Sequence, residues 1–335
     1  MQSDQWLAQV REEILDPDLP ICDPHHHLWD HPRSRYLLDE LLADTGSGHR
    51  VVSTVFVECA SMYRADGPVP LRPVGETEFV NGIAAISASG HYGPTRVAAG
   101  IVGFADLALG EGVAAALDAH LAASPRFRGI RHAAGWDASD EIRNSHTKPP
   151  RGLFNDGAFR RGFAELGRRG LSFDAWLYHP QLPELTALAR AFPDTPIVLD
   201  HFGGPLGIGP YAGRRAEIFA GWRSAIRAVA DCPNVVAKLG GLVMPINGFG
   251  FHKGARPATS AELVEATRDW YLHAIDCFGP ARCMLESNFP VDRQSCSYHV
   301  LWNAFKRLTA DFSAGDRAAL FHDTAARVYR LAPRP

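Results

Sequence analysis

The sequence has little of what marks a nucleic-acid-binding, membrane or secreted protein. Its 34 Lys and Arg residues are offset by 37 Asp and Glu residues, and a formal net charge of −3 gives no basic excess to attract nucleic acid or an anionic membrane. No apolar run approaches the roughly 20 residues that span a bilayer. The N-terminus lacks a basic segment followed by an apolar core, so it does not resemble a signal peptide. We therefore expect a cytoplasmic protein with neither a nucleic-acid nor a membrane partner.

Cysteine is also scarce, and its spacing excludes common metal and disulfide motifs. The chain has six cysteines, with no Cys-x-x-Cys pair and no zinc-ribbon spacing. Reduced thiols agree with a cytoplasmic location. Low-complexity tracts and linkers are absent too, so we predict a single domain over residues 1–335, with residues 1–18 as an N-terminal extension.

Short apolar or β-branched runs alternate with longer amphipathic stretches along the chain. The runs predict strands at Ile21–His25, Val51–Glu58, Val97–Phe104, Phe127–His132, Leu171–Leu177, Pro196–His201, Val235–Leu239 and Arg282–Ser287. The stretches predict helices at Glu78–Ser89, Gly112–Ala123, Phe159–Arg169, Leu182–Ala191, Arg214–Ala230 and Ser260–Phe278. Eight strands alternating with helices favour parallel pairing, and eight is the number that closes a barrel. We predict an α/β fold of the (β/α)8 TIM-barrel type.

Three of the predicted strand-to-helix connections are long, at about 59–77, 133–158 and 240–260, and they are rich in Gly, Pro and polar residues. On a TIM barrel such loops emerge at the C-terminal face, where active sites are built.

The run Asp23-Pro24-His25-His26-His27-Leu28-Trp29-Asp30 follows the first predicted strand. Residues two apart on a strand point to the same face, so His25 and His27 can converge while His26 faces away. Two converging imidazoles are suited to one metal ion. A solvated loop is the alternative interpretation of three adjacent histidines.

Polar or charged residues end seven of the eight predicted strands. They are His25 and His27, Glu58, Arg131 and His132, Tyr178 and His179, Asp200 and His201, Lys238, and Glu286 with Ser287 and Asn288. Such side chains are costly to bury unless they are paired or bound to metal. We therefore predict that they gather at one face of the barrel.

Histidines and glutamates of this set form a candidate metal site: His25, His27, His179, His201, Glu58 and Glu286. Nitrogen-rich ligands with some carboxylate suit Zn²⁺, Mn²⁺ or Fe²⁺ and disfavour Mg²⁺ and Ca²⁺. Two alternatives stay open, because the Tyr-His-Pro turn could point His179 outward, and Glu58 could instead fix a histidine tautomer.

Four residues are candidates for substrate binding. Arg131 would project into the barrel mouth as a carboxylate clamp, with a plain ion pair as the alternative. His132 is either a site residue or a core histidine. Lys238 interrupts an apolar strand and would be neutralised by a nearby carboxylate. His252 lies in the glycine-rich segment 248–254, which has the composition of a mobile lid.

Together these motifs resemble the amidohydrolase superfamily, and within it the amidohydrolase 2 group of TIM-barrel metal-dependent hydrolases, which includes sugar lactonases and pyrone-dicarboxylate lactonase. The resemblance covers nearly the whole chain. It rests on the triple-histidine run and on Val-Phe-Val-Glu58-Cys, Gly-Ile-Arg131-His132, Val-Leu-Asp-His201-Phe-Gly-Gly-Pro, Val-Ala-Lys238-Leu and Glu286-Ser-Asn288-Phe-Pro-Val-Asp292. It implies that His25 and His27 form the metal pair of the first strand, and that His179 and His201 match the histidines after strands five and six.

The chain departs from its relatives at the last strand. Many of them carry Gly-Ser-Asp-Trp-Pro there, with the aspartate as metal ligand and general base, whereas this chain has Asn288 at that catalytic position. Asparagine cannot take a proton from water. Glu286, two residues earlier on the same strand face, would supply a displaced carboxylate, with Glu58 as the alternative base and Asp292 as a weaker substitute.

The leading functional hypothesis is hydrolysis of a lactone, ester or amide of a small carboxylate-bearing substrate by metal-activated water. A dinuclear Fe or Mn/Fe oxygenase and a metal-dependent decarboxylase are the alternatives, because barrels that resemble this one include both. A non-enzymatic binding subunit is a further one. Aromatic loop residues (Tyr63, Trp136, Phe249 and Phe251) favour a partly apolar, aromatic ligand, although such residues also pack loops onto barrels. A homodimer is the general expectation for oligomeric state.

Overall fold

The computed structural model describes residues 3–32 and 34–332. The ends of the predicted domain, residues 1–2 and 333–335, and residue 33 lie outside the described residues. The division into one domain with an N-terminal extension stays a prediction.

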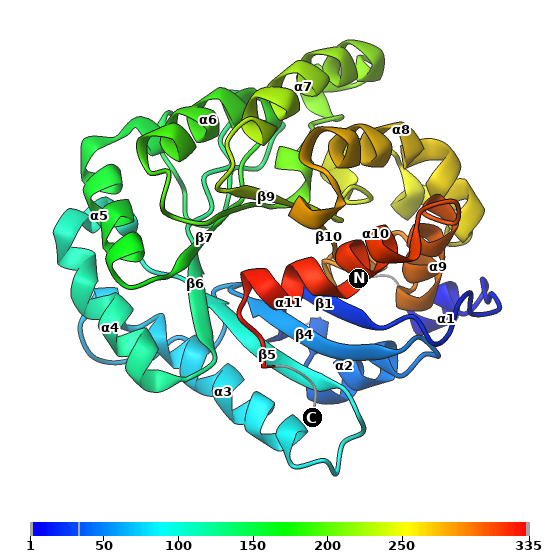
Figure 1. Ribbon diagram of the computed structural model, residues 1–335, viewed down its shortest axis with the longest axis horizontal. Coiled ribbons are helices and arrows are strands. Elements are labelled where there is room, and N and C mark those ends of the chain that lie inside the picture. Colours follow the sequence, from blue (N-terminus) through cyan, green and yellow to red (C-terminus); the bar gives the residue numbers. More distant parts are fainter. Residues whose placement is uncertain (1–2, 33, 333–335) are drawn as a thin grey trace.

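Eight parallel strands form one sheet that curls into a nearly closed barrel (Figure 1). They are β1 (Ile21–His26), β4 (Val51–Val57), β5 (Arg96–Gly103), β6 (Phe127–Arg131), β7 (Ser172–Ala175), β8 (Ile197–Leu199), β9 (Val235–Leu239) and β10 (Cys283–Leu285), paired in that order. A parallel bridge between His26 and Phe289, just after β10, joins the two ends of the sheet. The predicted (β/α)8 TIM barrel is confirmed, and each predicted strand overlaps an observed one.

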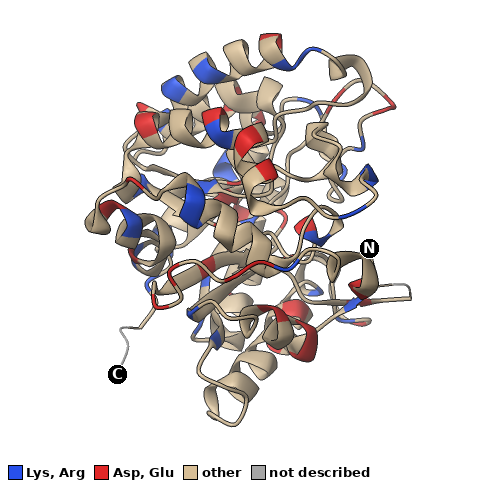
Figure 2. Ribbon diagram, turned by 90° about the vertical axis from the view of Figure 1, so that its right-hand side faces the viewer, with Lys and Arg blue, Asp and Glu red and all other residues tan. Residues whose placement is uncertain are grey.

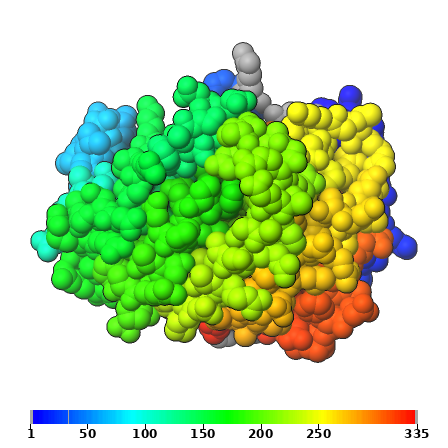
Figure 3. Space-filling view, turned by 90° about the horizontal axis from the view of Figure 1, so that it is seen from above, coloured from blue at the N-terminus to red at the C-terminus, as the bar shows by residue number. Residues whose placement is uncertain are grey.

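Helices between the strands surround the sheet. They are α3 (Val74–Ala88), α4 (Ala114–Ala123), α5 (Gly157–Arg168), α6 (Leu182–Ala191), α7 (Arg215–Ala230) and α8 (Ser260–Phe278). Figure 3 shows the molecule from above, where residues of about 150 to 260, coloured green to yellow, form most of the visible face. In Figure 2, basic and acidic residues are interspersed over another side. No described helix is long and apolar enough to cross a membrane.

Elements that the sequence did not predict lie near the two chain ends. They are α1 (Asp4–Leu7), a small hairpin of β2 (Trp29–His31) and β3 (Ser34–Tyr36), α2 (Leu38–Thr45), α9 (Tyr298–Leu308), α10 (Ala314–Ala318) and α11 (Thr324–Val328). The interior of the barrel is a separate apolar cluster, composed of Cys22, Val55, Val57, Val102, Val198, Val236, Met284, Ala325 and Tyr329. Because Ala325 and Tyr329 belong to it, the C-terminal segment covers one end of the barrel.

Candidate active site

The two outer histidines of the triple-histidine run converge at the C-terminal end of β1. The Nε2 atoms of His25 and His27 lie 3.3 Å apart, and both residues are buried. His26 points the other way, where its Nε2 contacts Thr54 Oγ1 at 2.9 Å and its ring lies against Phe56. The period of two along a strand therefore places the first and third imidazoles in the barrel mouth, as predicted.

Arg131 at the end of β6 joins these histidines to Glu58, the residue after β4. Arg131 Nε donates to Glu58 Oε1 at 2.7 Å, and its Nη1 lies 3.3 Å from His25 Nε2. The second carboxylate oxygen of Glu58 contacts His146 Nε2 at 3.0 Å. Burial by itself would raise the pKa of Glu58, but the charges of Arg131 and His146 outweigh it and lower this pKa to about 2. Glu58 is therefore an ionised carboxylate with both oxygens engaged.

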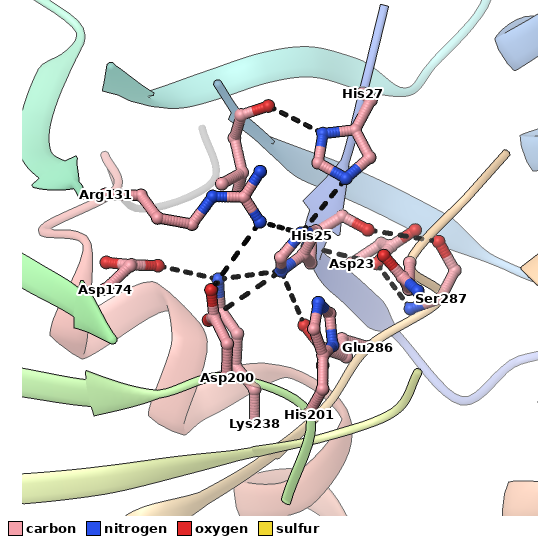
Figure 4. A network of polar contacts seen from close by, with 12 residues as sticks. Asp23, His25, His27, Arg131, Asp174, Asp200, His201, Lys238, Glu286 and Ser287 are labelled. Carbon is pink, nitrogen blue, oxygen red and sulfur yellow. Dashed lines mark hydrogen bonds and ion pairs between the residues drawn. The ribbon is translucent and has the colours of Figure 1, made fainter. Parts of the chain in front are cut away.

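Lys238, on the buried strand β9, is neutralised by two carboxylates, where the sequence predicted one. Its Nζ lies 2.7 Å from Asp174 Oδ2 on β7 and 3.3 Å from Asp200 Oδ1, directly after β8. The same ammonium lies 3.2 Å from His25 Nδ1. Tyr329, from the C-terminal segment, donates its hydroxyl to Asp174 Oδ2 at 2.6 Å. A polar column thus runs from Tyr329 to His25, and Figure 4 shows its part from Asp174 through Lys238 to His25.

Glu286, the residue after β10, contacts two histidines of the cluster. Its Oε1 lies 2.6 Å from His201 Nδ1 and its Oε2 lies 2.8 Å from His25 Nδ1. The chain makes room for this approach at Gly241, where an added Cβ would lie 2.5 Å from the His201 ring and where φ is +69°. His201 itself has a φ of 51°, an uncommon value for a residue with a side chain. The backbone conformations of Gly241 and His201 therefore allow the His201 imidazole to lie beside Glu286.

Burial keeps the imidazoles of β1 neutral. It lowers the pKa of His25 well below the ordinary value, and the nearby Lys238 lowers it further. The pKa of His27 is likewise lowered, by burial and then by Arg131. Neutral imidazoles retain a lone pair, which is the form that binds metal ions.

The cluster fits a metal ion. His27 Nδ1 contacts Val57 O at 2.8 Å, and since a carbonyl can only accept, the His27 Nε2 lone pair faces the cluster. Two nitrogens of one tetrahedral ion, each about 2.0–2.1 Å from it, lie about 3.3 Å apart. The His25–His27 spacing equals this value. Asp200 and Glu286 are fully buried; Lys238 Nζ lies 3.3 Å from Asp200 Oδ1 and His25 Nδ1 lies 2.8 Å from Glu286 Oε2, but among the described residues neither Asp200 oxygen nor Glu286 Oε2 accepts a well-aligned hydrogen bond.

Asp200 also groups with two imidazoles. Ligand atoms of His25, Asp200 and His201 lie within 4.8 Å of one another. These three residues with His27 and Glu286 provide nitrogen and carboxylate donors, a set that suits Zn²⁺, Mn²⁺ or Fe²⁺.

Four predicted site residues have other surroundings. His132 accepts from Leu107 N at 3.3 Å and packs against phenylalanine rings, which is the core-histidine alternative. His179 accepts from Leu206 N at 3.2 Å, and among the described residues no hydrogen bond, ion pair or ring contact joins it to the cluster. His252 lies in a short turn of the 240–259 loop, and Asn288 donates to Asp292 Oδ1 at 3.0 Å. Roles for these residues stay predictions.

Two site residues were missed, Asp174 and His146, and Asp200 was noted at the end of a strand but given no role. Asp174 and Asp200 stand in or after apolar strands, the signal that identified Lys238, so they could have been found in the same way. His146 lies in the loop between β6 and α5, where nothing in the sequence distinguishes it from a solvated histidine.

Comparisons with known proteins agree with this geometry. A family model described as Amidohydrolase matches residues 22–331. The chain is 36% identical to the uncharacterized protein y4mH of Sinorhizobium fredii, over 94% of this chain and 99% of the relative. It is 33% identical to the L-fucono-1,5-lactonase of Burkholderia multivorans, over 63% of this chain and 64% of the relative. The structure is similar to an amidohydrolase of the same species with bound zinc, with 27% identity, a TM-score of 0.71 and coverage of 93% and 99%.

Proposed function

The chain belongs to the amidohydrolase family, a family of metal-dependent enzymes, and on this premise we propose that it is a metal-dependent hydrolase that opens a lactone or ester of a small carboxylate-bearing molecule. The observation that carries the proposal is the convergence of two neutral imidazoles, with Nε2 atoms 3.3 Å apart, on the buried carboxylates of Asp200 and Glu286. Neutral imidazole and carboxylate donors gathered at one buried point are the ligands that such a metal ion requires.

His25, His27, His201 and Asp200 are the residues proposed to hold the ion, which is Zn²⁺, Mn²⁺ or Fe²⁺. When bound, this ion would supply Lewis-acid polarisation of the scissile carbonyl and activation of water. His201 donates through Nδ1 to Glu286 Oε1, which leaves its Nε2 lone pair for the ion. In both His27 and His201, a hydrogen bond at Nδ1 therefore fixes the tautomer whose Nε2 lone pair can bind the ion.

Glu286 is the proposed proton acceptor. Its Oε1 accepts from His201 Nδ1, and its Oε2 lies 2.8 Å from His25 Nδ1 without accepting a well-aligned hydrogen bond from a described residue. A carboxylate at this position can take a proton from water and return it to the leaving oxygen. Asn288, at the position of the usual base, instead donates its amide to Asp292. Glu286, two residues before Asn288, would therefore supply the carboxylate chemistry of the absent aspartate.

Arg131 is the proposed carboxylate clamp. Its Nη1 lies 3.3 Å from His25 Nε2, so a substrate carboxylate on this guanidinium would be adjacent to the reacting carbonyl. The lactonase activity in the name of the Burkholderia multivorans relative supports a lactone as the substrate class. The free thiols of all six cysteines agree with a cytoplasmic enzyme. We also propose that the enzyme is a homodimer, the commonest form of soluble oligomer.

The test combines metal analysis with a hydrolysis assay. Protein purified without chelator is expected to contain stoichiometric Zn, Mn or Fe by elemental analysis. It should release acid from a panel of lactones that includes L-fucono-1,5-lactone, followed with a pH indicator. Removal of the metal should abolish acid release, and readdition should restore it. A metal-replete protein that opens no lactone or ester of the panel would contradict the proposal.

The same preparation distinguishes the alternative reactions. Two metal ions per chain, including iron with an EPR signal, would favour the oxygenase. Release of CO₂ from an aromatic acid would favour the decarboxylase. A protein without stoichiometric metal and without turnover would favour a binding subunit.

A further inference from the structure

A cavity of about 980 Å³ lies at the end of the barrel opposite the candidate active site. The first residues of β4 and β5 (Val51–Ser53 and Arg96–Val97) line it, as do residues next to the start of β6, helices α2 and α3, and the C-terminal segment. Parallel strands begin at the same edge of a sheet, so these walls belong to the N-terminal face. The volume is within the roughly 300–1,000 Å³ of small-molecule sites.

Positive charge dominates the walls of this cavity. Four arginines line it, Arg50, Arg96, Arg126 and Arg128, and no acidic residue is among the described lining residues. Arg330 is not a lining residue but lies next to one, because its Nη2 donates to the backbone oxygen of Arg128 at 3.2 Å. Arginine binds carboxylate and phosphate groups through a planar fork of donors.

None of these five arginines forms an ion pair within the described parts of the chain. Their hydrogen bonds go to neutral acceptors, for example from Arg128 Nε to Tyr329 O at 2.7 Å and from Arg126 Nη1 to the Asn81 side chain at 3.1 Å. Arg169 shows the contrast, because it pairs with both Asp118 and Glu165. Within the described residues, these arginines therefore have no anionic partner.

Grouped like charges raise the free energy of the folded chain. Burial lowers the pKa of Arg128, and the positive charges of Arg330 and Arg126 lower it further. A bound anion would remove this repulsion. The cluster is therefore better suited to a charged ligand than to water alone.

The walls between the arginines are apolar, formed by Leu42, Ala84, Ala88, Val97 and Leu331. We propose that this cavity is a binding site for a small organic anion that has an apolar body and at least two negative charges on a phosphate ester or a dicarboxylate. The site is separate from the catalytic face and does not depend on the proposed function.

Isothermal titration calorimetry with phenyl phosphate and with phthalate tests the proposal and separates the two kinds of charged group. Inorganic phosphate and sodium chloride at equal ionic strength serve as reference titrants. The informative variant is Arg96→Glu, because Arg96 is exposed and makes no contact with a described partner that the fold would lose. Arg126→Ala is a second variant, and Arg190→Ala, at an exposed arginine on α6, is the matched control.

We expect one site per chain for at least one aromatic dianion, bound more tightly than inorganic phosphate. Arg96→Glu and Arg126→Ala should each weaken this binding at least tenfold, while Arg190→Ala leaves it unchanged. Heats no larger than those of sodium chloride would overturn the proposal, as would binding insensitive to both cavity variants.

Discussion

The Glu286 carboxylate and the His201 imidazole lie 2.6 Å apart, from Oε1 to Nδ1, after two strands that β9 separates in the barrel. This contact fixes the ring of His201, and the other oxygen of Glu286 lies 2.8 Å from His25 Nδ1. A single carboxylate thus orients one candidate ligand and presents a proton acceptor beside His25.

Glu286→Gln is expected to abolish turnover while the metal is retained. The amide oxygen of glutamine can still accept from His201 Nδ1, so the ring keeps its orientation, but an amide cannot accept a proton from water. Loss of a general base lowers the rate by about 10²–10⁴-fold. Steady-state kinetics and elemental analysis of the same sample check both statements. Turnover within about twofold of wild type would contradict the assignment.

Asp200→Asn is expected to lose metal rather than only turnover. The buried carboxylate of Asp200 groups with His25 and His201, and an amide is a weaker ligand than a carboxylate. Metal affinity should fall at least about tenfold, since even outer-shell changes cost this much. Competition with a chromophoric chelator measures it. Asp118→Asn, on exposed helix α4, is the control, and equal affinities in both variants would contradict the prediction.

Asn288→Asp restores the residue common among relatives, yet it should destabilise this chain. Asn288 donates to Asp292, which is fully buried, so an aspartate would replace a donor by a second acceptor or charge. An unsatisfied buried group costs about 1–3 kcal/mol. Urea unfolding should show this loss, and kcat/KM should not rise. Asn288→Ala, which removes the donor without adding charge, should be less destabilising.

The barrel could be predicted because its strands are buried on both faces. Such strands are short apolar runs, and the sequence shows each of them between amphipathic stretches. The alternation along β1 likewise placed His25 and His27 on one face. Helices near the C-terminus were missed because no strand follows them, so the alternating pattern that identified the others was absent.

The pairing inside the site could not be predicted in the same way. Glu58 meets Arg131 and His146, residues 73 and 88 positions away, and only the closure of the barrel brings them together. Sequence reasoning therefore indicated that Lys238 needs a carboxylate, but not that Asp174 and Asp200 both supply one. The sequence likewise left open whether Arg131 binds a substrate carboxylate or forms an ion pair within the protein. The contact with Glu58 forms only in the closed barrel.

Lys238→Met is expected to destabilise the fold strongly. It leaves the buried carboxylates of Asp174 and Asp200 without their ammonium partner, a change that costs about 3–5 kcal/mol. Chemical unfolding measures the loss. Adding Asp174→Asn to this variant should recover part of it, because one uncompensated charge disappears. A double variant as unstable as the single one would show that the charges of the pair are not the cause.

Neutral buried histidines should make the protein sensitive to mild acid, and His120, on helix α4, offers a test at a histidine outside the catalytic cluster. Burial lowers its pKa to about 4, while its ring contacts Thr77 Oγ1 at 2.8 Å and Phe104 O at 2.9 Å. The unfolded chain therefore binds a proton near pH 6.5 that the folded chain does not bind until about pH 4. The stabilisation is present above pH 6.5 and is lost as the pH falls towards 4.

His120→Asn should remove this contribution from the pH dependence of unfolding. Between pH 6 and 4.5 the slope of the unfolding free energy should decrease by up to about 1.4 kcal/mol per pH unit, the value for one proton. Urea unfolding at a series of pH values measures the slope. His91→Asn, at an exposed histidine, is the matched control and should leave it unchanged. Equal slopes in wild type and His120→Asn would show that His120 is already protonated in the folded protein.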